Sequence, residues 1–261
     1  MHALRIAIAT ACFQQPLKVA VRMAAEAGAA GVQLDVRDEL RPGELSETGR
    51  RQFLHRLDEL GLKVAALHFP ARRPFSSPDQ IDARVAATKS ALDFAAQLGA
   101  GVVTARVGRV PTEASSDDYR LLQEVLSDLA RHANHVGAIL AITPTHDAPQ
   151  ALGELLATIK TGPIGINFDP AEFVMSGHSA GPALRGLHAL VQHFEARDGV
   201  RDIDGGGLEV ALGRGEVDWV ELLPLLAEIP YRGWLTVSRT GGDDIVGDAV
   251  RAVQYLKQVL H

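Results

Sequence analysis

Polar side chains follow short apolar runs at several places in the chain, and their types are those that move protons or bind ions. Asp169 and Glu172 follow the run GINF, Glu195 and Arg197 lie in VQHFEARD, and His68 ends KVAALH. Carboxylates and imidazoles are the usual general acids and bases, and carboxylates are also the preferred ligands of Mg²⁺ and Mn²⁺. We therefore predict Glu195, Asp169 and His68 as catalytic residues, with Asp169 and Glu195 as metal ligands.

Other residues in the same kind of position are predicted to bind substrate, together with Glu172 and Arg197. Arg106 is suited to bidentate binding of a phosphate or carboxylate. The hydroxyls of Thr143 and Ser238 can hydrogen-bond a sugar, but their pKa values are too high for general bases. His146 and Asp147 resemble a base and its orienting carboxylate, although adjacent loop residues point in different directions.

Each of the main candidates also has a structural interpretation. Asp169 precedes a proline and can cap or turn the chain, and Glu195 can be an ion-paired carboxylate. His68 can be a hydrogen-bonded core residue. For His193, which lies deeper in the same apolar run as Glu195, the interior role is preferred, and we expect it to support Glu195.

The elements that must position these residues form a repeated strand and helix pattern with a period of about thirty residues. The predicted strands are Leu4 to Thr10, Gly31 to Val36, Leu62 to Leu67, Gly101 to Arg106, Ala138 to Ile142, Pro163 to Phe168, Leu190 to Glu195 and Gly233 to Val237. The predicted helices are 16–28, 46–60, 78–98, 117–135, 148–160, 178–188, 218–228 and 243–260.

Helix signals support this division of the chain. Ser46, Ser116 and Asp218 are suited to cap helix N-termini. Glycine readily adopts the left-handed backbone conformation in which many helices end. Such glycines precede four of the strands, at Gly28, Gly61, Gly99 and Gly137.

The pattern predicts an α/β fold, a single (β/α)8 TIM barrel over residues 1–261. Eight strand and helix pairs fit a closed barrel, and no G-x-G-x-x-G motif follows the first strand, as an open dinucleotide-binding sheet would have. The longest insertion, Arg197 to Val217, follows the seventh strand. In a barrel the polar residues above lie at the C-terminal ends of the strands, where active sites form.

Composition limits the class of protein. With 26 basic and 32 acidic residues the formal charge is −6, and no Lys/Arg-rich run is present, so we expect no nucleic-acid partner. No apolar run is long enough for a membrane helix. The one cysteine, Cys12, cannot form an internal disulfide, and no secretory signal is evident in MHALRIAIATA, so we expect a cytoplasmic location.

Six segments carry a resemblance to the xylose isomerase-like TIM barrel family, which includes sugar isomerases, sugar epimerases, hydroxypyruvate isomerases and apurinic endonucleases. They are AAEAGAAGVQLD, LDELGLKVAAL, GINFDPAEFVMSGHSA, VQHFEARDGVRD, ALGRGEVDW and YRGWLTVSRTGG. The resemblance implies one divalent cation (Mn, Mg or Zn) that polarises a keto-sugar carbonyl. Its ligands, Glu, Asp, His and Glu, come from strands 5 to 8, and the two glutamates move the proton.

This chain departs from that ligand pattern. The four positions fall on Thr143, Asp169, Glu195 and Ser238, so one of four is retained and both proton-transfer glutamates are replaced. The family's strand 2 glutamate is Gln33 here. The resemblance thus implies a depleted, altered metal site.

Two functions remain open from the sequence. One is a sugar (phosphate) isomerase or epimerase acting on a small keto-sugar or hydroxy-carbonyl compound. The other is a catalytically degenerate barrel that binds a carbohydrate-like ligand or regulates. An apurinic endonuclease needs a three-zinc cluster and a basic DNA surface, which the sequence lacks. Barrels of this family often pair, which leaves a homodimer open.

Overall fold

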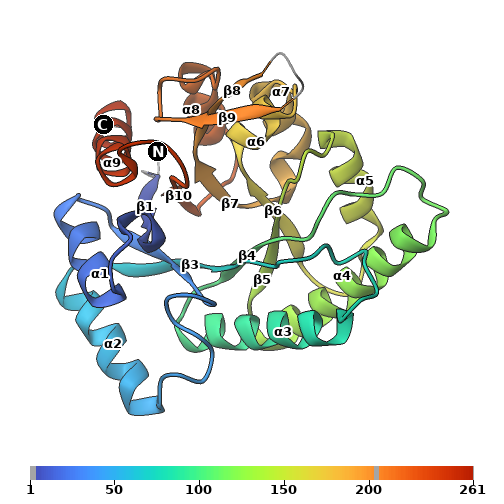
Figure 1. The fold of residues 1–261 in the computed structure, drawn as a ribbon, viewed down its shortest axis with the longest axis horizontal. Coiled ribbons are helices and arrows are strands. Elements are labelled where there is room, and N and C mark those ends of the chain that lie inside the picture. The colour runs from blue at the N-terminus through green and yellow to red at the C-terminus, as the bar shows by residue number, and fades with distance from the viewer. Residues whose placement is uncertain (1–3, 203–205, 261) are drawn as a thin grey trace.

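Eight parallel strands close into a barrel in the computed structural model, which describes residues 4–202 and 206–260, and helices surround the barrel (Figure 1). The strands are β1 (Arg5–Ala9), β2 (Gly31–Asp35), β3 (Lys63–Phe69), β4 (Val102–Arg106), β5 (Ile139–Thr143), β6 (Ile164–Phe168), β7 (Val191–Ala196) and β10 (Trp234–Val237). Around the barrel their order is β1, β10, β7, β6, β5, β4, β3, β2. The predicted TIM barrel is confirmed.

Eight helices follow the strands at the predicted places. They are α1 (Leu17–Glu26), α2 (Glu47–Glu59), α3 (Ile81–Gln97), α4 (Asp117–Val136), α5 (Pro149–Thr158), α7 (Ala180–Leu187), α8 (Trp219–Glu228) and α9 (Ile245–Val259). The caps Ser46, Ser116 and Asp218 each accept a hydrogen bond from a backbone N–H three residues on. The four helix-ending glycines all have positive φ, between 69° and 85°.

Five elements of the described chain were not predicted: two short 3₁₀ helices, η1 (Thr10–Phe13) and η2 (His188–Leu190), the helix α6, and the strands β8 and β9. The helix α6 (Pro170–Met175) directly follows β6, and the side chain of Asp169 caps it by accepting from the N–H groups of Ala171 and Glu172. Six residues are too few to show a helical period. The predicted insertion contains an antiparallel hairpin of β8 (Asp198–Arg201) and β9 (Gly207–Val210).

Aromatic packing fixes the part of the barrel that carries the polar residues. Phe168 of β6 lies with its ring centroid 5.0 Å from Phe173 of α6 and 5.2 Å from Phe194 of β7, and Phe194 contacts Trp219 of α8. These buried rings hold the ends of β6 and β7 against their helices, so the polar side chains beside them have defined positions. None of the described helices is long and apolar enough to span a membrane.

Candidate active site at the mouth of the barrel

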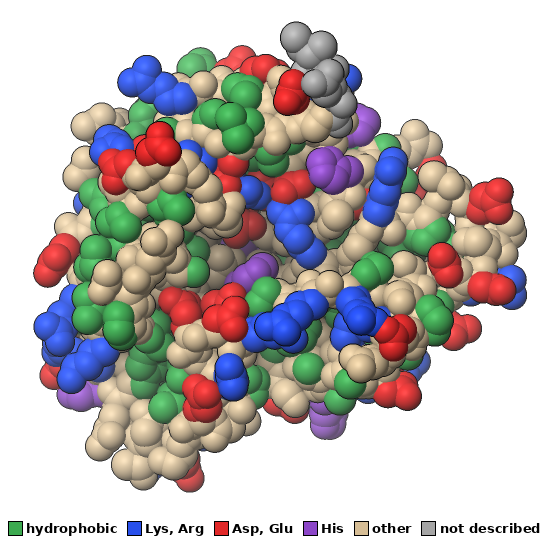
Figure 2. All heavy atoms as spheres, in the orientation of Figure 1, with side chains coloured by type: hydrophobic (Ala, Val, Ile, Leu, Met, Phe, Trp, Pro, Cys, Tyr) green, Lys and Arg blue, Asp and Glu red, His purple; other side chains and the backbone are tan. Residues whose placement is uncertain are grey.

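A cavity of about 330 Å³ opens at the C-terminal ends of the strands. Six of the nine predicted site residues line it: His68, Arg106, Thr143, Glu195, Arg197 and Ser238. Figure 2 shows a hollow on this face in which acidic, basic and histidine side chains gather. A larger cavity, about 670 Å³, lies at the opposite end, among strand starts such as Lys63 and Gly233. Barrel enzymes react at the C-terminal end, so we assign the site to the smaller cavity.

Glu195 and His68 face the cavity from opposite sides of the barrel. Glu195 is on β7 and His68 is on β3, and three strands separate β7 from β3 in either direction around the closed barrel. A small molecule held in the cavity therefore lies between a carboxyl group and an imidazole.

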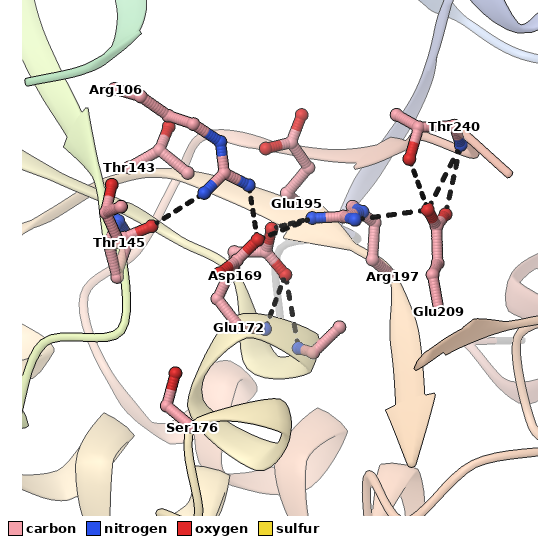
Figure 3. Close-up of polar contacts among 12 residues, drawn as sticks. Arg106, Thr143, Thr145, Asp169, Glu172, Ser176, Glu195, Arg197, Glu209 and Thr240 are labelled. Atoms are coloured by element: carbon pink, nitrogen blue, oxygen red, sulfur yellow. Dashed lines mark hydrogen bonds and ion pairs between the residues drawn. The ribbon is translucent and has the colours of Figure 1, made fainter. Parts of the chain in front are cut away.

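Arg197 lies at the centre of an ion-pair cluster, just past the end of β7. Its Nη1 is 2.5 Å from Oδ2 of Asp169 and 3.5 Å from Oε1 of Glu172, and its Nη2 is 3.2 Å from Oε2 of Glu209 on β9. Figure 3 shows the guanidinium between Asp169 and Glu209. Burial disfavours the charged form, but the charges of Asp169 and Glu209 outweigh burial and raise the pKa of Arg197. Arg197 is thus a fixed cation at the cavity wall.

One donor of this cation has no partner within the described chain. The Nε of Arg197 is buried and makes no hydrogen bond. A buried N–H without an acceptor costs about 1 to 3 kcal/mol. Arg197 lines the cavity with other atoms, and this Nε is shielded from it.

Arg106 supplies a second cation from the end of β4. Its Nη2 pairs with Oε1 of Glu172, and its Nη1 donates to the carbonyl of Pro144 at 3.0 Å. Glu172 therefore sits between Arg106 and Arg197, and Asp169 lies fully buried behind Arg197. Asp169 and Glu172 support the two arginines and do not line the cavity.

Glu195 is a buried carboxyl group in contact with the cavity. Asn167 of β6 donates from Nδ2 to Oε2 of Glu195 at 2.7 Å and to Oγ1 of Thr143 at 2.9 Å. Burial, and next the negative charge of Asp169, raise the pKa of Glu195 to about 7. A carboxyl group with this pKa exchanges protons easily near neutral pH, as a general base or acid requires.

Burial disfavours the charged forms of His68, at the cavity, and of His193, in the barrel interior. Burial, with the nearby charges of Arg106 and Arg197, lowers the pKa of His68, against the opposing effect of Asp35. Its Nδ1 is 3.1 Å from Oγ1 of Thr104. Burial lowers the pKa of His193 to about 3.

The predictions for His193 and His146 are not supported by the geometry. His193 is an interior residue as predicted, but its Nε2 lies 3.5 Å from Nε2 of Gln33, and Asn167 takes the supporting role beside Glu195. His146 is exposed, contacts Ser176 at 3.0 Å and does not line the cavity. Asp147 accepts from the N–H groups of Val110 and Thr145, so it joins two loops and orients no base.

The residues present do not fit the divalent cation that the resemblance implies. Within residues 4–202 and 206–260, no three His, Cys, Asp or Glu side chains are grouped so that they could hold a metal ion. Asp169 is already paired with Arg197, and Thr143 and Ser238 contribute only neutral hydroxyls. A hard cation needs several carboxylate or water oxygens, so the predicted metal ligation by Asp169 and Glu195 finds no support here.

Sequence reasoning missed Asn167 and Glu209 and also three polar residues that line the cavity, Gln33, Asp35 and Thr240. Asn167 is two residues before Asp169, on the same face of β6, so strand alternation was a usable signal. Glu209 pairs with Arg197 and lies 3.4 Å from Arg239, and Thr240 donates to it. No signal in the sequence pointed to Glu209, because its place depends on the register of the hairpin.

Comparisons with known proteins agree with the fold and with the sequence resemblance. A family model described as "Xylose isomerase-like TIM barrel" matches residues 21–259. A "putative hydroxypyruvate isomerase" of Streptomyces coelicolor is 27% identical over 210 residues, which are 72% of this chain and 73% of that protein. A xylose isomerase domain protein from Planctomyces limnophilus has a crystal structure that superposes with a TM-score of 0.82 at 25% identity, covering 99% of this chain and 95% of that chain.

A more distant structure shows the same fold. It is a xylose isomerase-like TIM barrel protein from Mycobacterium smegmatis in complex with magnesium, with a TM-score of 0.80 at 17% identity, covering 100% of this chain and 98% of that chain. The family match spans most of the sequence and agrees with the closed barrel. The chain therefore belongs to the xylose isomerase-like TIM barrel family.

Proposed function

We propose that the protein is an isomerase that moves a proton between adjacent carbons of a small α-hydroxy-carbonyl compound, with Glu195 as the base. The single observation that carries this is a buried carboxyl group at the wall of the cavity, Glu195, which accepts a hydrogen bond from Asn167 and whose pKa is raised by burial and by the charge of Asp169. Family membership and the relative named as a putative hydroxypyruvate isomerase support the reaction class.

The proton transfer follows from the chemistry of such a substrate. The Glu195 carboxylate takes the proton from the carbon that bears the hydroxyl. The electron pair left behind forms a carbon–carbon double bond, and the substrate becomes an enediolate with its negative charge on the former carbonyl oxygen. Glu195 then returns the proton to the neighbouring carbon, and a proton passes between the two oxygens. No oxidant or other reactant is needed.

Arg197 is suited to stabilise the negative charge of the enediolate. It is a cation at the cavity wall that Asp169 and Glu209 hold in place, so its positive charge lies close to the oxygen atoms of a bound substrate. A preorganised charge in a dry site stabilises developing charge without reorganisation. We propose that this guanidinium takes the electrostatic role that the resemblance gives to a divalent cation.

The pairing of Glu195 with His68 favours isomerisation over epimerisation. Epimerisation at one carbon needs two groups that exchange its proton from opposite faces. His68 stands opposite Glu195, but its lowered pKa makes it a weak base. A neutral imidazole is instead suited to pass the proton between the two substrate oxygens, the step that an isomerase requires.

Proton exchange in D₂O, followed by ¹H NMR, tests this function. Chelator-treated protein is incubated with hydroxypyruvate and with three- to six-carbon ketoses, and we expect loss of the proton signal at the reacting carbon together with the isomeric product. Glu195→Gln should slow the exchange by on the order of 100-fold or more. Glu113→Gln, an exposed carboxylate in the loop before α4, is the matched control.

Three outcomes would count against the proposal. Exchange that needs added Mn²⁺ or Mg²⁺ would refute the role of Arg197 as the cation. Inversion at one carbon without a shifted carbonyl would make the protein an epimerase. Ligand binding with no exchange for any substrate would favour the non-catalytic binding barrel.

A further inference from the structure

Four arginines line a further cavity, of about 340 Å³, beside the ends of β2 and β3. Arg37 follows β2, Arg72 and Arg73 lie in the loop after β3, and Arg84 lies in the first turn of α3. The other lining residues are uncharged: Phe69, Ala71, Gln80, Ala83 and Ala87. Within the described chain, every charged side chain that lines this arginine pocket is therefore positive.

The arginine pocket is separate from the active-site cavity and lies on the other side of β3. None of the described residues lines both cavities. His68 lines the active-site cavity, whereas the next residue of β3, Phe69, lines the arginine pocket. Successive side chains of a strand point to opposite faces, so the arginine pocket is on the outer face of the barrel wall. A molecule bound there is not the substrate of the active site.

Three of the four guanidinium groups have no carboxylate partner in the part of the chain that the structure describes. Arg73 pairs with Asp79, whereas Arg37 donates to the backbone carbonyl of Pro70. Arg72 is exposed and makes no hydrogen bond or ion pair with any described residue. A carbonyl oxygen accepts a hydrogen bond but does not neutralise a guanidinium.

Arg84 is also held by backbone carbonyls alone. It donates from Nη1 and Nη2 to the carbonyls of Asp79 and Ser77, both at 2.5 Å. Desolvation, and next the charge of Arg73, lower the pKa of Arg84. The guanidinium of Arg84 is therefore fixed in position while its charge stays uncompensated, and a bound anion would offset the repulsion among these cations.

The positive charge of the arginine pocket is local. The chain as a whole has a formal charge of −6, so its overall field repels anions. An anion that binds at this place must therefore be attracted by the guanidinium groups that line the pocket.

We infer that the arginine pocket is a second binding site, which takes the diphosphate group of a small molecule. Three uncompensated cations are matched by about three negative charges, which is close to the charge of a diphosphate group near neutral pH. Guanidinium groups bind phosphate oxygens through pairs of parallel hydrogen bonds. Two linked phosphates offer oxygens to Arg37, Arg72 and Arg84 at once, whereas a single phosphate or carboxylate satisfies fewer of these donors.

Calorimetric titration with inorganic pyrophosphate, inorganic phosphate and citrate, at constant ionic strength, tests the inference without any turnover. Pyrophosphate should bind at least about tenfold more tightly than phosphate or citrate, because it contacts more of the guanidinium groups. Arg72→Ala should weaken pyrophosphate binding about tenfold, through the loss of one charge-assisted contact, and Arg72→Glu should weaken it further. Because Arg72 is exposed and has no partner among the described residues, both variants should fold normally.

Arg22→Ala is the matched control, since Arg22 is an exposed arginine on α1 and lines neither cavity, and it should leave pyrophosphate binding unchanged. Equal affinity for pyrophosphate and phosphate would overturn the inference, and so would citrate that binds as tightly as pyrophosphate. Pyrophosphate binding that is the same in the wild type, Arg72→Ala and Arg72→Glu would place the anion elsewhere on the protein and overturn it as well.

Discussion

Replacement of Glu195 by Gln should make the protein more stable than the wild type at high pH. Glu195 has an ordinary pKa of 4.5, and burial and the charge of Asp169 raise it to about 7 in the folded protein. Between these values the folded state binds more protons than the unfolded state, so the wild-type stability falls as pH rises. Gln cannot ionise, and its Oε1 can still accept the hydrogen bond of Asn167.

The size of this stability difference follows from the rise in the pKa of Glu195 from 4.5 to about 7. At 1.36 kcal/mol per unit the full penalty is about 3 kcal/mol, and about 2.5 kcal/mol of it falls between pH 5 and pH 8. The free energy of unfolding of Glu195→Gln minus that of the wild type should therefore increase by about 2.5 kcal/mol over this range.

Urea denaturation of both proteins at pH 5, 6, 7 and 8 measures this difference, with Glu113→Gln as the control for the loss of a carboxylate at an exposed site. If kcat/KM of the wild type is limited by the ionised base, it should rise through the same pH, near 7. A stability difference that stays constant from pH 5 to pH 8 would refute the raised pKa and with it the assignment of Glu195 as the base.

Three further substitutions test the supporting structure by urea unfolding. Arg197→Met should cost about 3 to 5 kcal/mol, because it leaves the fully buried Asp169 without its paired cation and removes one of the two arginines that pair with Glu209; an effect below 1 kcal/mol would contradict the cluster. Asp198→Asn should cost at least about 2 kcal/mol, since Asp198 accepts from four N–H groups. Gly108→Ala should cost about 1 to 3 kcal/mol, because φ is +94° and the new Cβ meets a proline at 2.3 Å. Gly186→Ala, with open space around its Cβ, should not destabilise the protein.

The sequence was sufficient for the barrel because each repeat carries its own local signals. Strand runs, caps such as Ser46 and left-handed glycines such as Gly61 depend on neighbours within a few residues, so they can be read from the chain alone. The position of the site followed from the barrel, since the ends of parallel strands meet on one face. The hairpin and α6 were missed because six-residue and four-residue elements leave too short a period.

The partners within the site could not be predicted in the same way. Arg197 and Asp169 are 28 residues apart, and their contact depends on side-chain reach between two strands. From the sequence both looked like substrate or metal ligands, because nothing local shows that an arginine neutralises the aspartate. Likewise, it depends on the pairing of β6 and β7 that Asn167, and not His193, supports Glu195. The register of this pairing shifts between Ile166 and Asn167.

The substitutions at three of the four ligand positions that the resemblance implies are better understood as one electrostatic change than as separate losses. A divalent cation with two glutamates, one aspartate and one neutral histidine has a net charge of −1. Here Thr143 and Ser238 are neutral, and Asp169 and Glu195 with the guanidinium of Arg197 also sum to −1, or to zero when Glu195 is protonated. Removing only the glutamates would have left a divalent cation underligated, and removing only the cation would have left repelling carboxylates. The balanced exchange, with a cation kept at the wall of the cavity and one carboxyl group held near neutral pKa, favours an active proton-transfer site over a barrel whose catalytic residues have simply decayed.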